Sequence, residues 1–577
     1  MAVRVLYITS EVFPFAKTGG LADVSASLPA ALRERGFDVR VLVPGYPQAL
    51  QRATDAKEVL RLGDPLGCGE VRVLETHVPR SNVPVWLVDC PPLYNRAGGL
   101  YQSESGEDWS DNALRFALLS HVAAGIADEP GPSWRPELIH CNDWHAGLLP
   151  LLLAARGRLR PATLFTIHNL AYQGLFAADE LARLNLPANA FSVMEFYGGI
   201  SFLKAGIQLA DAITTVSPTY AKEILTSELG CGLDGLLRER AESLTGILNG
   251  ADYNVWDPGI DPHIASNYSA RAIAPKADCK HALQTELALD ADADTPLMAF
   301  MSRLVEQKMP DVVLDSLPPL LEEGAQFVVV AEGKNEYEAR FRELAAHHPG
   351  RVAVKSYQEE LAHRLLAAAD MLVHPARFEP YGLVPIYAMR YGAIPLVRKT
   401  GGMADTVIDA SPDGMRRGIA TGLLFDEPTS EQLVASIRRA MSLYRLPISW
   451  RRLQAHAMRQ DFSWQRSAAT YADLYRSLTG IASPEIKSAQ DEIMAEGARL
   501  AAGTRKAPMP NLEGLPNRTF MPRASKSNFL QAVHTIDTPH ALAGRSSIDR
   551  RAASSEATNA EPFDGGVHHG CRIPDLK

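Results

Sequence analysis

Two nearly identical seven-residue segments hold the first residues that could do chemistry. Lys17-Thr-Gly-Gly-Leu-Ala-Asp23 and Lys399-Thr-Gly-Gly-Met-Ala-Asp405 differ at a single position, and each follows an apolar run and opens a helical pattern. A Gly-Gly pair lets the backbone approach a ligand, and the first N–H groups of a helix carry about half a positive charge. These segments are typical of anion-binding turns for a phosphate or a nucleotide sugar. The alternative is a tight turn with a solvated lysine.

Further positive charge follows another apolar run. Arg303 comes directly after a predicted strand and Lys308 begins the next helical pattern, so both side chains could reach one diphosphate. Glu379 follows a third run, beside a proline that marks a helix start, where a carboxylate could accept hydrogen bonds from sugar hydroxyls. The alternatives are two exposed cations and an ordinary N-terminal charge on a helix.

Polar side chains also gather after two apolar runs nearer the N-terminus. Cys141-Asn-Asp-Trp-His145 and Thr166-Ile-His-Asn-Leu-Ala-Tyr-Gln-Gly174 bring histidines, a carboxylate, an indole and amides to strand ends. We expect no metal site there, because no His/Glu pair beside these motifs has i, i+4 spacing. Asp290-Ala-Asp-Ala-Asp294 superficially resembles a metal-binding Asp-x-Asp motif, but it precedes a strand instead of following one.

Short apolar runs alternate with helical patterns and indicate an α/β protein with parallel sheets. The predicted strands form a first series (Arg4–Thr9, Asp38–Val43, Val71–Glu75, Val85–Val88, Glu137–His140, Thr163–Ile167, Ala212–Val216) and a second (Leu297–Met301, Gln326–Val330, Arg351–Lys355, Met371–His374, Ile394–Val397). We therefore predict two Rossmann-like, doubly wound domains, 1–250 and 251–447. They should face one another across a cleft, because such sheets bind ligands at the carboxyl ends of their strands.

Two further segments follow the second domain. Residues 448–480 have a helical pattern and are predicted to pack back on the N-terminal domain. Beyond them aromatic residues become scarce and large apolar residues fall below what a core needs, so residues 481–577 are predicted to form a disordered tail.

The composition narrows the classes of partner. With 58 basic and 67 acidic residues the net charge is -9, which argues against nucleic acid or an anionic membrane as the main partner. No apolar stretch approaches the roughly 18 residues of a membrane span, and the N-terminus lacks the apolar region of a signal peptide. The six cysteines form no C-x-x-C pair, so a reducing cytoplasm is expected. Nothing in the sequence specifies an oligomeric state.

Taken together, the motifs resemble those of bacterial glycogen synthases, members of glycosyltransferase family 5 that are related to plant starch synthases. The resemblance covers about residues 1–480, and the motifs occur in the family's order. They are Ser10-Glu-Val-Phe-Pro-Phe-Ala-Lys-Thr-Gly-Gly-Leu-Ala-Asp-Val24, Asn142-Asp-Trp-His-Ala-Gly147, Thr166–Gly174, Asn249-Gly-Ala-Asp-Tyr253, Arg377-Phe-Glu-Pro380 and Thr400-Gly-Gly-Met-Ala-Asp-Thr406.

The resemblance implies the glycosyltransferase B fold and a retaining transfer of glucose from ADP-glucose to the non-reducing end of an α-1,4-glucan. The N-terminal domain would then lie on the acceptor side and the C-terminal domain would bind the donor. Fixed cations would neutralise the departing diphosphate, so that neither a metal nor another cofactor is needed.

The same resemblance assigns roles to single residues. Arg303 and Lys308 would hold the diphosphate, Glu379 the glucose hydroxyls, and His168 would lie under the anomeric carbon. Lys17 would bind ADP-glucose, and Asp143 and Tyr101 would line the acceptor side. The full set of expected substrate-binding residues is Lys17, Gly19, Gly20, Asp23, Tyr101, Asp143, Asn169, Asn249, Tyr381, Gly382, Leu383, Thr400, Gly401 and Gly402.

The chain departs from the family pattern beside two of these residues. Met309 stands after Lys308 where the family usually has glycine, and Tyr381-Gly-Leu-Val-Pro385 replaces Cys-Gly-Leu-Thr-Gln or Cys-Gly-Leu-Asn-Gln. The second change places a phenol near the presumed sugar and removes an amide. A glycosyltransferase of the same fold that uses UDP-glucose or a small acceptor is therefore the alternative function.

Overall fold

The computed structural model describes residues 2–128, 134–155 and 160–480. The first of its sheets has the order β12-β11-β7-β6-β1-β2-β5-β4-β3 and is parallel except where β4 pairs with β3 and β5. Its strands are β1 (Arg4–Ile8), β2 (Asp38–Pro44), β3 (Lys57–Leu62), β4 (Val71–His77), β5 (Pro84–Asp89), β6 (Leu138–Asn142), β7 (Ala162–Ile167), β11 (Ala212–Thr215) and β12 (Leu244–Gly246).

The second large sheet is wholly parallel and has the order β15-β14-β13-β16-β17-β18. Its strands are β13 (Leu297–Leu304), β14 (Gln326–Gly333), β15 (Val352–Lys355), β16 (Met371–His374), β17 (Ile394–Arg398) and β18 (Leu423–Phe425). We call the first sheet with its helices the N-lobe and the second sheet with its helices the C-lobe. A small antiparallel sheet, with β8 (Leu175–Phe176), β9 (Glu195–Phe196) and β10 (Gly199–Ser201), belongs to the N-lobe.

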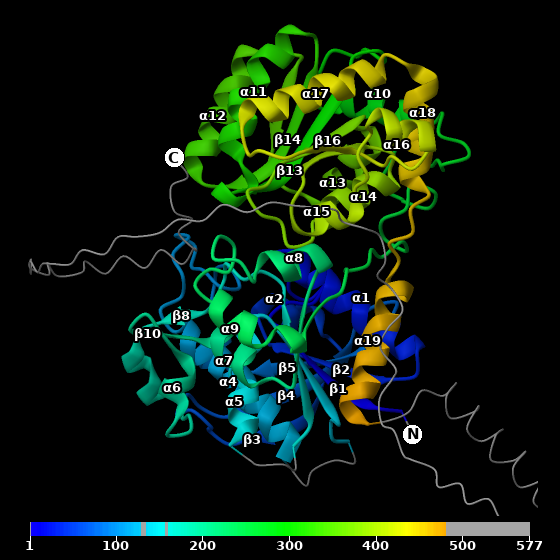
Figure 1. Cartoon of the computed structure of the whole chain (residues 1–577). Helices are drawn as coiled ribbons and strands as arrows, with labels where there is room; N and C mark the ends of the chain where they lie inside the picture. The colour runs from blue at the N-terminus through cyan, green and yellow to red at the C-terminus, as the bar shows by residue number, and fades with distance from the viewer. Residues whose placement is uncertain (1, 129–133, 156–159, 481–577) are drawn as a thin grey trace, which may run out of the picture. The chain divides into compact units, whose positions relative to one another are not determined.

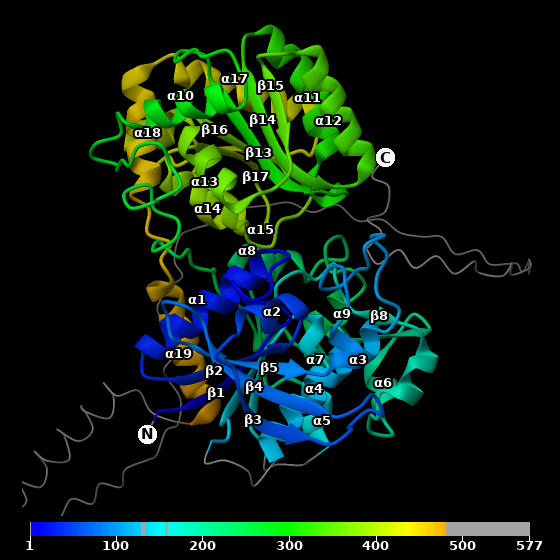
Figure 2. The same cartoon turned by 180° about the vertical axis from the view of Figure 1, so that it is seen from behind.

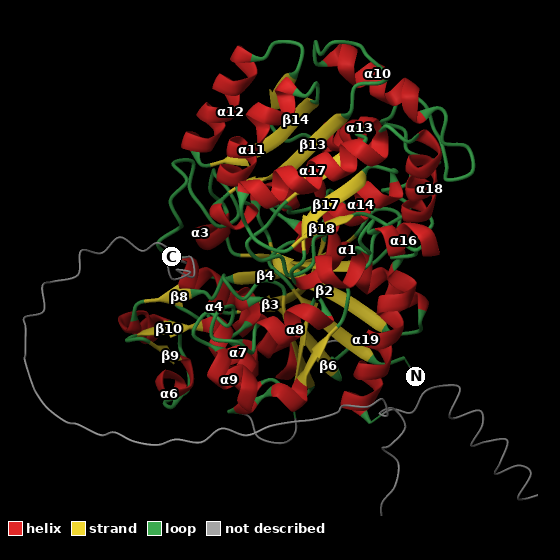
Figure 3. Cartoon of the chain, turned by 45° about the horizontal axis from the view of Figure 1, so that its top comes forward, coloured by secondary structure: helices red, strands yellow, loops and turns green. Residues whose placement is uncertain are grey.

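Helices flank the strands of both large sheets (Figure 3). Those of the N-lobe are α1 (Gly20–Glu34), α2 (Pro47–Arg52), α3 (Pro91–Tyr94), α4 (Asn112–Asp128), η1 (Trp144–Ala146), α5 (Leu149–Ala154), η2 (Ala178–Arg183), α6 (Ala190–Met194), α7 (Phe202–Leu209), α8 (Pro218–Glu223), α9 (Asp234–Glu239) and η3 (Ala241–Ser243). Those that follow are α10 (Lys276–Glu286), η4 (Glu306–Lys308), α11 (Pro310–Glu322), α12 (Asn335–His347), α13 (Glu359–Ala368), α14 (Leu383–Arg390), α15 (Gly401–Thr406), α16 (Pro412–Arg417), α17 (Ser430–Tyr444), α18 (Pro447–Met458) and α19 (Trp464–Thr479).

In each large sheet the strand order reverses at one point. In the N-lobe β1 leads to β2 and β5 on one side, whereas β6, β7 and β11 lie on the other. In the C-lobe the reversal falls between β13 and β16. Ligands of open α/β sheets bind outside the carboxyl ends of the strands at such reversals. The motifs that follow β1 and β6, and those that follow β13 and β16, therefore occupy the positions where this fold binds ligands.

Every predicted strand is present, with its ends displaced by at most three residues, and the α/β class with two doubly wound sheets is confirmed. The central strands are continuous runs of buried apolar residues, as expected for a sheet that is covered on both faces. The sequence analysis missed the short strands β8, β9 and β10 of the small sheet and, in the large sheets, β3, β12 and β18. The charged, exposed side chains of β3 (Lys57–Leu62) at the sheet edge obscure the pattern, and β12 and β18 have three residues each.

The predicted helical segment 448–480 consists of two helices with different neighbours. Helix α18 packs against α17 and α14 of the C-lobe, whereas α19 packs against α1 of the N-lobe (Figures 1 and 2). The Tyr475 hydroxyl of α19 lies 2.7 Å from Nδ1 of the buried His140 in β6. The predicted tail, 481–577, lies outside the described residues.

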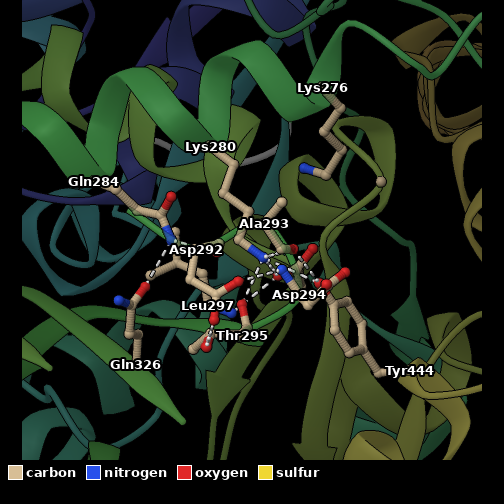
Figure 4. A network of polar contacts seen from close by, with 12 residues as sticks. Lys276, Lys280, Gln284, Asp292, Ala293, Asp294, Thr295, Leu297, Gln326 and Tyr444 are labelled. Atoms are coloured by element: carbon tan, nitrogen blue, oxygen red, sulfur yellow. Dashed lines mark hydrogen bonds and ion pairs between the residues drawn. The ribbon is translucent and has the colours of Figure 1, made fainter. Parts of the chain in front are cut away.

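The Asp290–Asp294 segment closes the amino-terminal edge of the C-lobe sheet. Asp292 accepts hydrogen bonds from Asp294 N (2.9 Å) and Thr295 Oγ1 (2.7 Å). Lys280 donates to the carbonyl oxygens of Ala293 and Thr295 and pairs with Asp370 at 2.8 Å (Figure 4). These contacts tie the loop to the sheet and account for its polar residues.

None of the helices in 2–128, 134–155 and 160–480 is long and apolar enough to cross a membrane. In the same residues, no group of three His, Cys, Asp or Glu side chains could hold a metal ion.

Candidate active site

Two of the expected site residues, Lys308 and Glu379, form a buried ion pair. Lys308 ends η4, which follows β13, and its Nζ contacts Oε2 of Glu379 in the loop that follows β16. Burial by itself raises the pKa of Glu379, but the charge of Lys308 and contact with His374 outweigh it and lower this pKa to about 2. Glu379 is therefore a buried carboxylate that stays ionised, and in this state both of its oxygens accept hydrogen bonds.

Backbone contacts hold these two loops against each other. Arg377 N donates to Gln307 O at 2.8 Å, and Gln307 Nε2 donates to Phe378 O at 3.1 Å. The Arg377 guanidinium pairs with Asp311 at 2.6 Å on α11. The loops that carry Lys308 and Glu379 are thus joined on both sides of their ion pair.

The second glycine segment packs against the backbone of the Glu379 loop. Gly402 N donates to the carbonyl oxygens of Glu379 (3.2 Å) and Pro380 (3.1 Å). A Cβ atom on Gly401 would lie 1.9 Å from Glu379 O, and one on Gly402 would lie 2.3 Å from Tyr381 O. These glycines are required for close packing of α15 on the loop.

The second segment also receives a carboxylate from the N-lobe. Glu223, the last residue of α8, accepts hydrogen bonds from Thr400 Oγ1 (3.0 Å) and Gly401 N (2.9 Å). In return Asp405 accepts from the backbone N (2.8 Å) and the hydroxyl (2.7 Å) of Thr219 at the start of α8. Helices α8 and α15 therefore cap one another across the two lobes.

The first glycine segment holds a carboxylate of its own lobe. Glu11, which is 4% exposed, accepts from the backbone N atoms of Thr18 (2.7 Å) and Gly19 (3.0 Å). Its other oxygen accepts from the Tyr101 hydroxyl at 2.6 Å. Each of the two turns therefore holds a glutamate carboxylate of the chain itself.

Lys17 reaches away from its own turn toward the C-lobe. Its Nζ lies 3.1 Å from Asp23 Oδ1 and 3.1 Å from Oε2 of Glu359, at the start of α13. Burial raises the pKa of Asp23 to about 6 despite this lysine. A pocket beside the cluster is lined by Asp23 and Glu359 together with aromatic residues that include Trp256 and Tyr387.

Arg303 faces the N-lobe. Its guanidinium carbon lies 5.9 Å from the centre of the Tyr172 ring. Burial raises the pKa of Glu11, and the charge of Arg303 acts in the opposite direction, so the two groups are near each other. A Cβ atom on Gly20 would lie 3.1 Å from Leu383 of the C-lobe. The loops after β1 and β13 therefore approach a common region.

Polar contacts between the loops after β6 and β7 position His168. Asp143 Oδ1 accepts from the backbone N atoms of His168 (2.9 Å) and Asn169 (3.4 Å), and Asn142 Oδ1 lies 2.9 Å from His168 Nε2. Desolvation lowers the pKa of His168 to about 3, so its ring is neutral at pH 7. Asp143 has a φ of 56°, a left-handed conformation that costs a non-glycine residue energy and is often found at functional sites.

The Tyr381 hydroxyl is bonded within the protein. It donates to the backbone oxygen of Asn249 at 2.5 Å, and Tyr381 is 3% exposed. Asn169 Nδ2, also from the N-lobe, lies 3.5 Å from Gln307 Oε1. The phenol that distinguishes this chain thus links the Glu379 loop to the segment that leaves the N-lobe.

Not all of the expected site residues meet. One connected set lies in the C-lobe and consists of Lys308, Glu379, Tyr381, Gly382, Leu383, Thr400, Gly401 and Gly402. A second set lies in the N-lobe and consists of Asp143, His168 and Asn169. Lys17 and Asp23 form a third set with Glu359, and within residues 2–128, 134–155 and 160–480 the Lys17 ammonium forms ion pairs only with these two carboxylates.

Sequence reasoning missed three residues of this region: Glu11, Glu223 and His374. Each is an acidic or imidazole side chain with no distinctive spacing, and its role depends on contacts that the fold alone creates. Met309 has a φ of 54°, the left-handed conformation that favours glycine. This conformation suits the glycine that the resemblance leads us to expect at the position, and the buried methionine is held there under strain.

Comparison with known proteins agrees with this geometry. The starch synthase catalytic domain family matches residues 4–239, and the glycosyl transferases group 1 family matches residues 287–454. A protein of Paramagnetospirillum magneticum named glycogen synthase is 51% identical over 484 residues, covering 83% of this chain and 98% of its own length. A Burkholderia thailandensis protein of the same name is 50% identical over 503 residues, covering 86% of this chain and 94% of its own.

Solved structures agree on the fold. The catalytic domain of starch synthase IV from Arabidopsis thaliana, which is bound to ADP and acarbose, superimposes with a TM-score of 0.75 and 30% identity, covering 83% of this chain and all of that one. Sucrose-phosphate synthase from Thermosynechococcus elongatus, at 18% identity and a TM-score of 0.53, shares the fold. The chain belongs to the glycogen synthase family, glucosyltransferases of glycogen synthesis with the glycosyltransferase B fold.

Proposed function

We propose that this chain transfers glucose, with retention of configuration, from ADP-glucose to the non-reducing end of an α-1,4-glucan. The observation that carries the proposal is the buried pair of Lys308 and Glu379, which lies where the C-lobe strand order reverses. Family membership supports the reaction type, and the ADP in the starch synthase IV structure supports the nucleotide.

In this proposal the C-lobe binds the donor. Arg303 and Lys308 hold the diphosphate, and the ionised Glu379 accepts hydrogen bonds from glucose hydroxyls. The bond between the anomeric carbon and the diphosphate breaks, a bond to the 4-oxygen of the glucan forms, and the proton of that hydroxyl leaves with ADP. Fixed cations stabilise charge that develops on the leaving group, and such groups typically contribute several kcal/mol each.

The N-lobe takes the acceptor side. His168 is neutral at pH 7, so it can lie beneath an electron-poor anomeric carbon without adding positive charge. Asp143 positions the His168 loop by accepting hydrogen bonds from the backbone N atoms of His168 and Asn169. Tyr101 positions Glu11 by donating its hydroxyl hydrogen bond to that carboxylate. Lys17 must exchange part of its contact with Asp23 and Glu359 for the donor.

Replacement of Lys308 tests the donor site. Lys308→Ala should lower the transfer rate about 10²–10³-fold, the usual cost of removing one fixed charge-stabilising donor. The measurement is release of ADP from ADP-glucose in the presence of glycogen. Arg351 offers a matched control, because it is a partly exposed cation of the C-lobe that pairs with Asp290. Arg351→Ala should retain nearly full activity. Normal turnover by Lys308→Ala would refute the assignment.

Donor preference is tested with the wild-type protein. Incubation with ADP-glucose or UDP-glucose, each with glycogen or with glucose as acceptor, should release nucleoside diphosphate fastest from ADP-glucose and glycogen. Faster turnover of UDP-glucose or of the small acceptor would favour the alternative function, which the residues from Tyr381 to Pro385 motivate.

We further propose that the protein needs no metal, because Arg303 and Lys308 supply the positive charge. The rate of ADP release should then be the same in EDTA as in Mg²⁺. Cys141 and Cys279 are free thiols, which suits the reducing cytoplasm that we propose as the site of action.

A further inference from the structure

His374 is a buried histidine beside the Lys308–Glu379 pair. It is the last residue of β16 and is 3% exposed. Its Nε2 lies 3.4 Å from Oε2 of Glu379, the oxygen that Lys308 also contacts. In the described part of the chain, neither ring nitrogen has a hydrogen-bond partner of good geometry. A buried imidazole with two unused polar atoms is costly, and such groups are commonly retained for a purpose.

Two side chains therefore compete for one carboxylate oxygen. Lys308 is a cation on a flexible stem, whereas His374 is a short, rigid side chain fixed at a strand end. Burial lowers the pKa of His374, and this effect outweighs contact with Glu379, which raises it; the charge of Lys308 adds to the lowering, so the ring is neutral. A neutral imidazole whose proton is on Nε2 can still donate one hydrogen bond to the carboxylate.

The proposed function places a conflicting demand on Lys308, since the same ammonium must serve the diphosphate. When Lys308 turns to the diphosphate, Glu379 loses its main partner. A buried carboxylate without a partner is expensive and free to rotate. Some other group must then hold it toward the sugar hydroxyls, and His374 is the second side chain in contact with Oε2.

We propose that His374 is a positioning residue that holds Glu379 through an Nε2–H···Oε2 hydrogen bond while Lys308 engages the diphosphate of a nucleoside diphosphate sugar. The inference rests on the proposed function, because it assumes that Glu379 contacts the sugar. It predicts that His374 matters for recognition of the glucosyl group and leaves recognition of the nucleotide diphosphate unchanged.

The test compares His374→Met with His374→Gln in the full chain. Methionine has a similar size and no donor, whereas the glutamine amide can place a donor near the position of Nε2. We expect His374→Met to lower kcat/KM for ADP-glucose about 10- to 30-fold, the cost of one hydrogen bond to a charged group. His374→Gln should recover activity to within about threefold of wild type.

Calorimetric titration separates positioning from packing. His374→Met should weaken binding of ADP-glucose, titrated without glucan, and leave the Kd of ADP within about twofold. His363 offers a matched control, because it is also a buried C-lobe histidine in contact with a carboxylate, Asp261, at 2.7 Å. His363→Met should lower the melting temperature without changing the ratio of ADP-glucose to ADP affinity.

The outcomes distinguish this inference from the proposed function. An inactive wild-type protein that does not bind ADP-glucose would refute both. An active wild type with equal losses in His374→Met and His374→Gln, or with ADP and ADP-glucose weakened equally, would overturn the role of His374 alone. If His374→Met does not fold, His374→Asn replaces it, since its shorter amide should fail to reach Glu379 and reproduce the loss.

Discussion

The two glycine segments have nearly the same sequence, yet they do different work. Both place a glutamate carboxylate on the N–H groups of a turn. At the first segment the carboxylate is Glu11, a buried neighbour in the same lobe. At the second it is Glu223, which comes from the other lobe. The first segment thus forms contacts within the N-lobe (the internal support), and the second connects the two lobes (the joint).

Packing around the glycines differs in the same way. Nothing lies within 4 Å of a Cβ placed on Gly19, and Gly20 would meet the flexible end of Leu383. In the second segment the neighbours are backbone atoms of the Glu379 loop. The repeated sequence therefore gives both segments the same turn, with N–H groups that bind a carboxylate. The segments differ in which carboxylate is bound and in what packs against the glycines.

The largest expected effect comes from adding a methyl group to the second segment. Gly402→Ala should destabilise the protein by about 3 kcal/mol or more, because the new Cβ would lie 2.3 Å from Tyr381 O and 2.5 Å from Tyr381 Cα. Gly19→Ala, the matched variant of the first segment, should change stability by less than about 1 kcal/mol. Urea unfolding measures both. Equal losses would show that the two turns are under the same packing constraint.

Removal of the two glutamates should separate the internal support from the joint. Glu11→Ala leaves two backbone N–H groups and the Tyr101 hydroxyl without their acceptor, which should cost about 2–4 kcal/mol of unfolding free energy. Glu223→Ala should cost about 1 kcal/mol, because the Glu223 side chain is only partly buried and accepts two hydrogen bonds, whereas Glu11 accepts three. Glu11→Gln keeps an acceptor and should fall between them. A larger loss in Glu223→Ala than in Glu11→Ala would reverse the comparison.

The lysines that open the two segments should also differ. Lys17→Met removes the shared cation of Asp23 and Glu359 and should raise the KM for ADP-glucose about tenfold. Lys399 is exposed, and Lys399→Met should leave KM within about twofold of wild type. Initial rates of ADP release at several ADP-glucose concentrations measure the difference. Similar effects would mean that both lysines serve the donor.

The smallest effect concerns Asp23 and depends on pH. Its raised pKa of about 6 means that the folded protein binds this proton more tightly than the unfolded chain does. Wild type therefore loses stability as pH rises through about 4 to 6, and Asp23→Asn does not. The stability of the variant relative to wild type should increase by about 1 kcal/mol between pH 5 and pH 7 in urea titrations. A difference that is flat, or that falls with pH, would show that Lys17 controls the charge of Asp23.

The sequence predicts the fold well for a physical reason, and the same reason is the basis for the predicted location of the site. Strands such as β1 and β14 have unbroken apolar centres (Val5–Ile8 and Phe327–Ala331), and parallel sheets bind their ligands at the carboxyl ends of strands. Arg303, Lys308 and Glu379 could therefore be assigned to that edge from their positions after strands. Their local partners within two or three residues, such as Gln307 and Arg377, follow from the same loops.

Contacts between distant segments could not be predicted. Glu223 meets Gly401 across 178 residues, Lys17 meets Glu359 across 342, and Tyr381 meets Asn249 across 132. Each depends on the relative placement of two lobes, which strand and helix patterns do not encode. The Tyr381 hydroxyl is an example. The sequence analysis predicts a phenol near the sugar, and in the structure its hydroxyl donates to the backbone oxygen of Asn249.

The contact of α19 with the N-lobe has a consequence for biosynthesis. Tyr475, which is fully buried against His140, emerges from the ribosome only after every residue of the C-lobe. The nascent N-lobe therefore lacks α19, and part of its surface beside α1 stays uncovered until about 230 more residues have been translated. We expect it to depend on chaperones during that interval more than the C-lobe does, since the C-lobe sheet is complete once β18 has left the exit tunnel.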